Sequence, residues 1–360
     1  MSLGFIAAAA CLSAPAFDGG ALPATSAVIV RASETVALTP KAYRTWRIEL
    51  PRDPFQVVSG SLPIPHAHGQ GFAVEVRGNG LAVDTDGDGQ VDRVVEGVVD
   101  PTTKVQRARV NLSGKTAEGV PFTYPVRLEG GGGAWKWAPG GALEGVIGDT
   151  EVCVIDLDGN GRYGDVGRDA IVVGDGDVAQ LLGEAIHVDG ELVHVEVDAA
   201  GATLAISPFE GATGTLDLRS ALAAKGVLLA AVVVSEDGRQ SFELSGAEDG
   251  ARVPAGRYRL QSALLGLGEA RVSVDAKDMA PIEVASGRSV ELAWGAPIQA
   301  SFEVQRSGGD LVFDPAAVQY VGRAGERWIG WDPAGKSPTF RIKEKETGDV
   351  LVDVVFPGSC

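Results

Sequence analysis

Two short stretches of the chain combine acidic side chains and glycines at a spacing that could bind a metal ion. The first reads DTDGDGQVD, from Asp84 to Asp92, and the second reads DLDGNGRYGD, from Asp156 to Asp165. Alternate side chains of a tight loop point toward one centre, and a hard cation such as calcium takes about six to eight oxygen ligands there. Because neighbouring carboxylates repel one another, both stretches predict a bound divalent cation.

The predicted ligands are the oxygens at alternate loop positions together with a carboxylate that closes each site. For the first loop they are Asp84, Asp86, Asp88, Gln90 (through its carbonyl), Asp92 and Glu96, with Asp100 as the alternative to Glu96. For the second loop they are Asp156, Asp158, Asn160, Arg162 (through its carbonyl), and Asp165 or Asp169. Gly89 and Gly161 stand at position six, where the loop must turn sharply.

This spacing resembles the first three quarters of an EF-hand or dockerin calcium loop. That family closes its loop with a glutamate at position twelve, where this chain has Val95 and Gly167. The residues after the two loops, RVVEGVVD and DAIVV, are β-branched and favour strands over amphipathic helices. The resemblance therefore implies two calcium ions in loops between strands, without the helix pairs that open in a calcium sensor.

Solvated turns are the alternative interpretation of both stretches, because Asp, Asn and Gly are also the residues that turns use. The repetition favours calcium, since both loops have oxygen side chains at positions one, three and five and glycine at position six.

The remaining sequence predicts a mainly β protein built from several antiparallel β-sandwiches, with the calcium loops between strands of the N-terminal half. Many segments alternate apolar and polar residues between turn residues, and the chain contains 49 glycines. Asp189-Gly190 between two alternating arms predicts a hairpin. Short helices are expected only at Asp175–Ile186 and Leu216–Lys225.

The length of 360 residues predicts several domains. The expected divisions are a signal segment at 1–16, an extension at 17–41, a β-rich region at 42–218 and sandwiches at 219–295 and 296–360. The glycine run EGGGG predicts a mobile loop or linker, with a possible split near 129–134. Short strands with regularly spaced turns in 219–295 and 296–360 predict two immunoglobulin-like sandwiches. In the first of them, ARVPAGRYRL resembles a stretch of prealbumin-like and carboxypeptidase-regulatory-like domains, which supports this fold.

The N-terminal run LGFIAAAACL, followed by Ala14-Pro15-Ala16, is typical of a secretory signal and predicts export. Alternatively, Cys11 could carry a bacterial lipid anchor. The net charge of −17 argues against nucleic acid and anionic membranes as partners. The expected location is therefore outside the cell or in the cell envelope, with membrane attachment only through Cys11.

Several other motifs resemble binding sites, but their surroundings in the sequence argue against a bound ligand. GWDPAGKS, from Gly330, satisfies a nucleotide-loop pattern but precedes a proline and a strand, so no nucleotide is expected. Gly159–Gly164 satisfies G-x-G-x-x-G within an acidic loop that would repel a pyrophosphate. His66 and His68 lack a third metal ligand nearby. Cys153 and Cys360 could form a disulfide or remain thiols.

The expected function is that of an exported, calcium-stabilised, non-catalytic structural or adhesive protein of the cell envelope. Trp135 and Trp137 alternate on a strand, and Trp328 and Trp331 cluster in RWIGW, so the first alternative is a carbohydrate-binding protein that stacks sugars on exposed tryptophans. A hydrolase of unknown substrate is the second alternative, although no catalytic motif supports an enzyme. The expected partners are calcium and either a glycan or another envelope protein.

Overall fold

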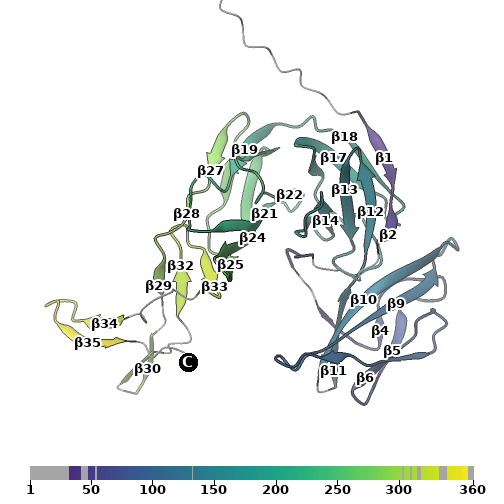
Figure 1. The fold of residues 1–360 in the computed structure, drawn as a ribbon, viewed down its shortest axis with the longest axis horizontal. Coiled ribbons are helices and arrows are strands. Elements are labelled where there is room, and N and C mark those ends of the chain that lie inside the picture. The colour runs from purple at the N-terminus through teal and green to yellow at the C-terminus, as the bar shows by residue number, and fades with distance from the viewer. Residues whose placement is uncertain are drawn as a thin grey trace, which may run out of the picture. The chain divides into compact units, whose positions relative to one another are not determined.

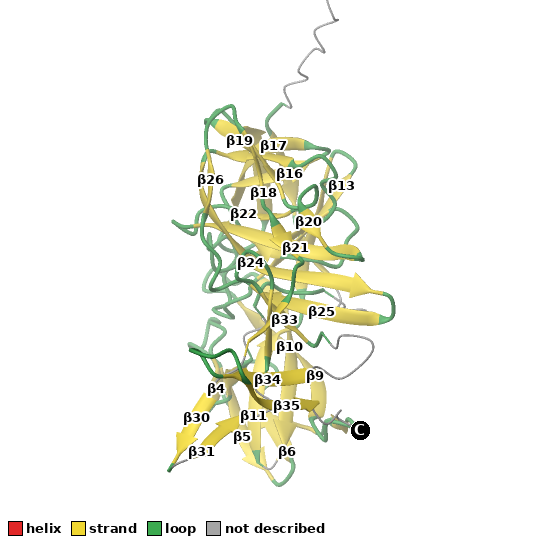
Figure 2. Ribbon diagram, turned by 90° about the vertical axis from the view of Figure 1, so that its left-hand side faces the viewer, coloured by secondary structure: helices red, strands yellow, loops and turns green. Residues whose placement is uncertain are grey.

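The computed structural model describes residues 32–41, 48–52, 55–131, 133–301, 304–308, 310–313, 318–331 and 339–355, all within one unit, Arg31–Cys360. Every regular element in these ranges is a strand, and none is a helix (Figure 2). The mainly β prediction is therefore confirmed. Within the described ranges, no helix offers the length and apolarity that a membrane crossing requires. The predicted signal segment at 1–16, with Cys11, lies outside the described residues.

Residues 55–139 form two facing sheets, which we call the N-terminal sandwich (Figure 1). One sheet has the order β3-β11-β10-β9-β8 and the other the order β4-β5-β6-β7. The strands are β3 (Gln56–Val57), β4 (Ser61–Leu62), β5 (Phe72–Arg77), β6 (Gly80–Val83), β7 (Arg93–Val95), β8 (Val98–Val99), β9 (Gln106–Lys115), β10 (Pro121–Gly131) and β11 (Ala134–Pro139). Alternate residues of both sheets, including Phe72, Leu112 and Trp137, form one buried core.

The first two glycines of the run end β10 and pair with β11, while the predicted split near 129–134 stays a prediction. Gly130 pairs with Trp135 and Gly131 with Ala134. A β-carbon at Gly130 would lie 2.5 Å from the Trp135 ring, so the glycine leaves the space that the indole fills. Packing against this ring therefore explains at least one glycine of the run.

We expect Gly130→Ala to destabilise the protein by about 1 to 3 kcal/mol, because the added methyl group overpacks the Trp135 ring. Urea unfolding followed by tryptophan fluorescence measures the loss. Gly246→Ala is the matched control, since a β-carbon at Gly246 would have no neighbouring atom within 4 Å. Equal stability of the two variants would contradict the packing argument.

The central sandwich consists of a five-stranded sheet, β15-β14-β13-β12-β2, and a four-stranded sheet, β1-β18-β17-β16. Its strands are β1 (Glu34–Ala37), β2 (Thr39–Lys41), β12 (Ala142–Ile147), β13 (Thr150–Ile155), β14 (Ala170–Val173), β15 (Gln180–Leu181), β16 (Ala185–Val188), β17 (Glu191–Val197) and β18 (Thr203–Pro208). The run 152–157 is buried throughout, because apolar clusters cover both faces of the five-stranded sheet. The predicted hairpin joins β16 to β17, with Asp189 and Gly190 at positive φ.

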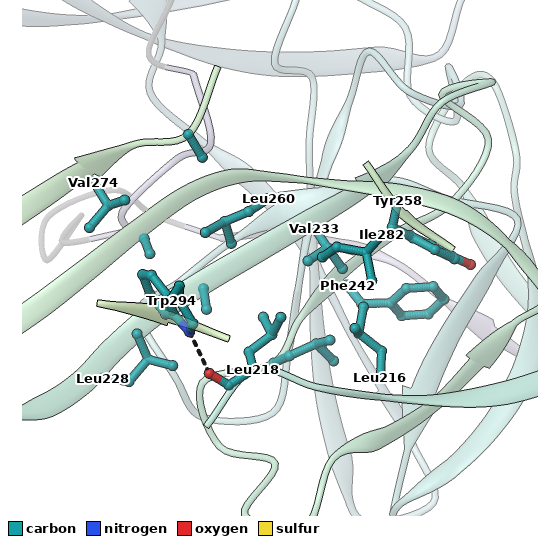
Figure 3. Packing of buried hydrophobic residues seen from close by; sticks show 14 of the residues in the cluster. Leu216, Leu218, Leu228, Val233, Phe242, Tyr258, Leu260, Val274, Ile282 and Trp294 are labelled. Carbon is teal, nitrogen blue, oxygen red and sulfur yellow. Dashed lines mark hydrogen bonds between the residues drawn. The ribbon is translucent and has the colours of Figure 1, made fainter. Parts of the chain in front are cut away.

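The C-terminal region, 213–355, centres on a sheet ordered β22-β21-β24-β25-β33-β32-β29, with β26 paired to β24. Its strands are β19 (Thr213–Asp217), β20 (Leu222–Ala223), β21 (Val227–Ser235), β22 (Ser241–Glu243), β23 (Ala251–Pro254), β24 (Gly256–Leu267), β25 (Ala270–Asp275), β26 (Ile282–Val284), β27 (Ser289–Glu291), β28 (Trp294–Gly295), β29 (Gln299–Ser301), β30 (Val304–Ser307), β31 (Asp310–Phe313), β32 (Gln319–Val321), β33 (Arg327–Ile329), β34 (Thr339–Lys343) and β35 (Val350–Val355). β19–β27 and β20–β28 pair in parallel, whereas the other pairings between named strands are antiparallel. In the core, the Trp294 indole donates to the Leu218 carbonyl at 2.7 Å (Figure 3).

Both helix predictions are wrong. The segment Asp175–Ile186 contains β15 and the start of β16, whose pairing with neighbouring strands replaces helical hydrogen bonds. The segment Leu216–Lys225 contains the end of β19 and all of β20. Between them, the Asp217 carboxylate accepts hydrogen bonds from the amides of Arg219 and Ser220, which forms a turn. Tertiary pairing therefore overrides weak local helix signals.

The predicted domain divisions remain a prediction, and the strand pairing does not follow all of them. β1 and β2, from the predicted extension at 17–41, pair with β18 and β12 of the central sandwich. β25 pairs with β33 across the predicted boundary at 295.

Candidate metal centres

The first acidic loop joins β6 to β7 at one end of their hairpin. The buried Asp84 carboxylate accepts the backbone amides of Asp86, Gly87 and Gly89 at 3.2, 2.7 and 2.9 Å. Gly87 and Gly89 have φ of 75° and 85°, a conformation that glycine adopts without strain. The loop therefore curls around its first carboxylate.

Three carboxylates of this loop form a group that could hold a metal ion. Asp84, Asp86 and Asp88 each offer a ligand atom, and these atoms lie within 4.8 Å of one another. Asp84 is buried, whereas Asp86 and Asp88 are exposed. The predicted spacing thus places side chains of positions one, three and five around one centre.

The other predicted ligands of the first loop lie outside this group. The Asp92 carboxylate accepts hydrogen bonds from the Thr85 backbone amide at 3.2 Å and the Thr85 hydroxyl at 3.0 Å. It therefore closes the loop by hydrogen bonds and does not join the carboxylate group. Glu96 lies near Gly80, at the other end of the β6–β7 hairpin. The Gln90 backbone amide donates to the Asp88 carboxylate at 2.7 Å. That the Gln90 carbonyl binds the metal ion stays a prediction.

The second acidic loop joins β13 to β14 and shares with the first loop the amide donors at positions four and six. The Asp156 carboxylate accepts the amides of Gly159, Asn160 and Gly161 at 2.8, 3.1 and 2.6 Å. Gly159 and Gly161 have φ of 71° and 77°, like the glycines at the same positions of the first loop. Two different stretches of sequence therefore fold into similar loops, because both have an oxygen side chain at position one and glycine at positions four and six.

The second loop also gathers three carboxylates that could hold a metal ion. Asp156, Asp158 and Asp169 offer ligand atoms within 4.8 Å of one another, and Asp156 and Asp169 are buried. Asp158 Oδ1 is shielded from solvent and has no hydrogen-bond partner. A carboxylate oxygen in this situation is costly without a cation, so the group fits a metal ion.

Burial increases the free-energy cost of ionising the carboxyl groups of Asp156 and Asp169. It raises the pKa of Asp156 to about 7, although hydrogen bonds from Tyr124 and the Gly161 amide lower it. Burial likewise raises the pKa of Asp169 to about 8, and the charges of Asp156 and Asp158 add to this rise. Arg168 lies 3.7 Å from Asp158, and its side chain is 72% exposed, so it neutralises the group only weakly. A divalent cation would relieve this cost.

Asp169, rather than Asp165, brings the third carboxylate to the second group. Asp169 accepts the amides of Leu157 and Asp165 at 3.2 and 2.8 Å. Asp165 instead accepts the Asn160 side-chain amide at 2.7 Å and so orients that residue. The Asn160 Oδ1 atom accepts the Arg162 amide at 2.8 Å, and the role of the Arg162 carbonyl stays a prediction.

Sequence reasoning missed two residues that contact the second loop from the N-terminal sandwich. The Tyr124 hydroxyl donates to Asp156 Oδ2 at 2.7 Å, in a buried hydrogen bond. The Gln56 side-chain amide donates to the Asp158 carbonyl at 2.6 Å. Nothing local in the sequence marks either residue, since Tyr124 follows the ordinary alternation of β10 and Gln56 belongs to a two-residue strand.

The other histidine, cysteine and glycine motifs have structural surroundings in the described ranges. His66 contacts the Phe72 ring at a centroid distance of 4.6 Å, and no group with a third metal ligand includes it among the described residues. Cys153 is a buried thiol beside Lys41, and Cys360 lies outside the described residues. The motif Gly159–Gly164 lies in the second acidic loop, while most of GWDPAGKS lies outside the described ranges.

Three of the four tryptophans of the sugar-stacking alternative are buried, and Trp331 is partly buried. Trp135 and Trp137 are 2% and 1% exposed and belong to the core of the N-terminal sandwich. They therefore cannot serve as an exposed platform for sugar rings. Trp328 is buried too, and Trp331 packs against it with ring centroids 5.7 Å apart.

Comparisons with protein-family models, with curated proteins and with solved structures find no match to this chain.

Proposed function

We propose that this chain is an exported, non-catalytic structural or adhesive protein of the cell envelope whose fold is stabilised by two calcium ions. The observation that carries the proposal is the second carboxylate group, in which Asp158 Oδ1 is buried without a partner beside Asp156 and Asp169. The repeat of the arrangement at Asp84, Asp86 and Asp88 supports a second ion. Export and the envelope location rest on the N-terminal signal pattern.

The ligand chemistry favours calcium among the common divalent cations. Both groups consist of carboxylate oxygens, which suit hard cations rather than zinc or copper. Magnesium requires a smaller and more regular octahedron, whereas calcium accepts about six to eight ligands with variable geometry. Exposed carboxylates, such as those of Asp86 and Asp88, leave room for the further ligands that calcium takes.

Calcium titration by calorimetry should give two ions per chain, with dissociation constants on the order of 10⁻⁴ to 10⁻³ M, as in extracellular sites. Asp86→Asn and Asp158→Asn should each remove one ion, because each deletes one charge from a different group. Asn keeps the side-chain shape, so the loops should still fold. Asp249→Asn, at an exposed position outside both groups, controls for the change in net charge. Unchanged stoichiometry in both loop variants would refute the assignment.

A further inference from the structure

The second acidic loop is a contact point between the two sandwiches. Asp156 follows β13 of the central sandwich, yet its carboxylate accepts the hydroxyl of Tyr124 from β10 of the N-terminal sandwich. The carbonyl of Asp158 accepts the side-chain amide of Gln56, from β3 of the same sandwich. Two of the three carboxylate residues of the group are therefore bonded directly to the N-terminal sandwich.

The two glycines of this loop fit closely against the N-terminal sandwich. A β-carbon at Gly159 would lie 2.6 Å from the Trp137 ring, and one at Gly161 would lie 2.7 Å from Pro65. The Trp137 ring belongs to the buried core of the N-terminal sandwich. The loop therefore meets this sandwich through packing as well as through hydrogen bonds.

The same loop is fixed to the central sandwich on its other side. The Tyr163 amide donates to the Ala199 carbonyl at 3.0 Å, in the turn between β17 and β18. Asp169, directly before β14, accepts the Leu157 amide at 3.2 Å and so ties the two ends of the loop together. An ion that holds Asp156, Asp158 and Asp169 would thus hold the surface on which the N-terminal sandwich rests.

The first acidic loop differs, because its contacts with the described residues lie within the N-terminal sandwich. The Ser113 amide, from β9, donates to the Thr85 carbonyl at 2.8 Å. A β-carbon at Gly87 would lie 3.0 Å from the ring of His66. The two loops have similar sequences but different surroundings. Removing the ion from each loop in turn therefore compares the effect of an ion at the junction with that of an ion within one sandwich.

We propose that the ion at Asp156, Asp158 and Asp169 fastens the N-terminal sandwich to the central sandwich, so that calcium decides whether the two unfold together. This inference rests on the proposed function, since it requires calcium at the second group. Without the ion, those of the three carboxyl groups that ionise repel one another, because their ligand atoms lie within 4.8 Å, and the loop relieves the repulsion by spreading. Spreading displaces Asp156 and Asp158, which carry the bonds to Tyr124 and Gln56.

The test is urea unfolding of the full chain, with hydrogen exchange measured separately for peptides of β9–β10 and of β12–β14. In saturating calcium, both sets of peptides should lose protection at the same urea concentration. With a chelator, the two midpoints should separate by about 1 M urea. Asp158→Asn should separate them even in calcium, whereas Asp86→Asn should leave them coincident in calcium.

A second variant separates the junction from ion binding itself. Tyr124→Phe keeps the buried ring but removes the hydroxyl that donates to Asp156. This variant should still bind the ion at the second loop. In saturating calcium, the urea midpoints of the β9–β10 peptides and the β12–β14 peptides should nevertheless differ. Coincident midpoints in Tyr124→Phe and in the chelated wild type would overturn the proposal.

Terbium luminescence distinguishes two negative outcomes: failure of the junction proposal alone, and failure of the proposed calcium site. Terbium ions replace calcium and emit when a nearby indole absorbs light, and Trp137 adjoins Gly159 of the second loop. Emission should persist in Asp86→Asn and disappear in Asp158→Asn. Terbium and calcium binding at the second loop without any change in the two midpoints would refute the junction alone. Absence of binding there would refute both proposals.

Discussion

Removal of calcium should lower the melting temperature of the protein by roughly 5 to 10 °C for each site that is emptied. An ion at about 100 times its dissociation constant adds about 2.7 kcal/mol to the free energy of unfolding. For folded units of about 150 to 250 residues, 1 kcal/mol corresponds to about 2 to 4 °C. Calorimetric scans in calcium and in a chelator measure the difference at neutral pH.

The double variant Asp86→Asn, Asp158→Asn is the control for this melting experiment. It lacks one charge in each carboxylate group, so its melting temperature should respond little to calcium or chelator. Magnesium at the same concentration should stabilise the wild type less than calcium does, because magnesium requires a stricter geometry. Identical wild-type scans with calcium and with chelator would rule out a stabilising ion.

The metal-free protein should become less stable as the pH rises from about 5 to about 8. Burial raises the pKa of Asp156 to about 7 and that of Asp169 to about 8. In the unfolded chain both groups ionise near pH 4, so over this range the folded state binds more protons than the unfolded state. The stability that the neutral carboxyls contribute is complete below pH 4 and is lost as the pH passes 7 to 8. The expected loss is on the order of a few kcal/mol.

Calcium should reverse this pH dependence. The ion binds ionised carboxylates, so protons compete with it and its affinity rises with pH. Urea unfolding at several pH values measures the free energy of unfolding with and without calcium. The difference between the two values should grow as the pH rises. Asp169→Asn, which removes one of the two titrating groups, should flatten the metal-free curve. A metal-free stability that rises between pH 5 and 8 would contradict the assignment of buried, raised-pKa carboxyls.

The sequence predicted those features that depend on neighbouring residues. Alternating apolar residues and Asp189-Gly190 predicted the strands and hairpin of β16 and β17, because side chains alternate sides along a strand and this dipeptide adopts positive φ. The spacing of Asp84, Asp86 and Asp88 likewise predicted their convergence. In such a short loop, glycines at fixed positions decide where the oxygens point.

The tertiary structure decided which of several plausible residues meet. Asp169 reaches the second group because β14 returns beside β13, whereas Asp165, nearer in sequence, orients Asn160. Trp135 and Trp137 face the opposing sheet of their sandwich, which a strand pattern alone cannot indicate. The bonds from Tyr124 and Gln56 to the second loop join residues 32 and 102 positions apart. Local spacing therefore determined the loops themselves, while their surroundings depended on long-range packing that no single segment encodes.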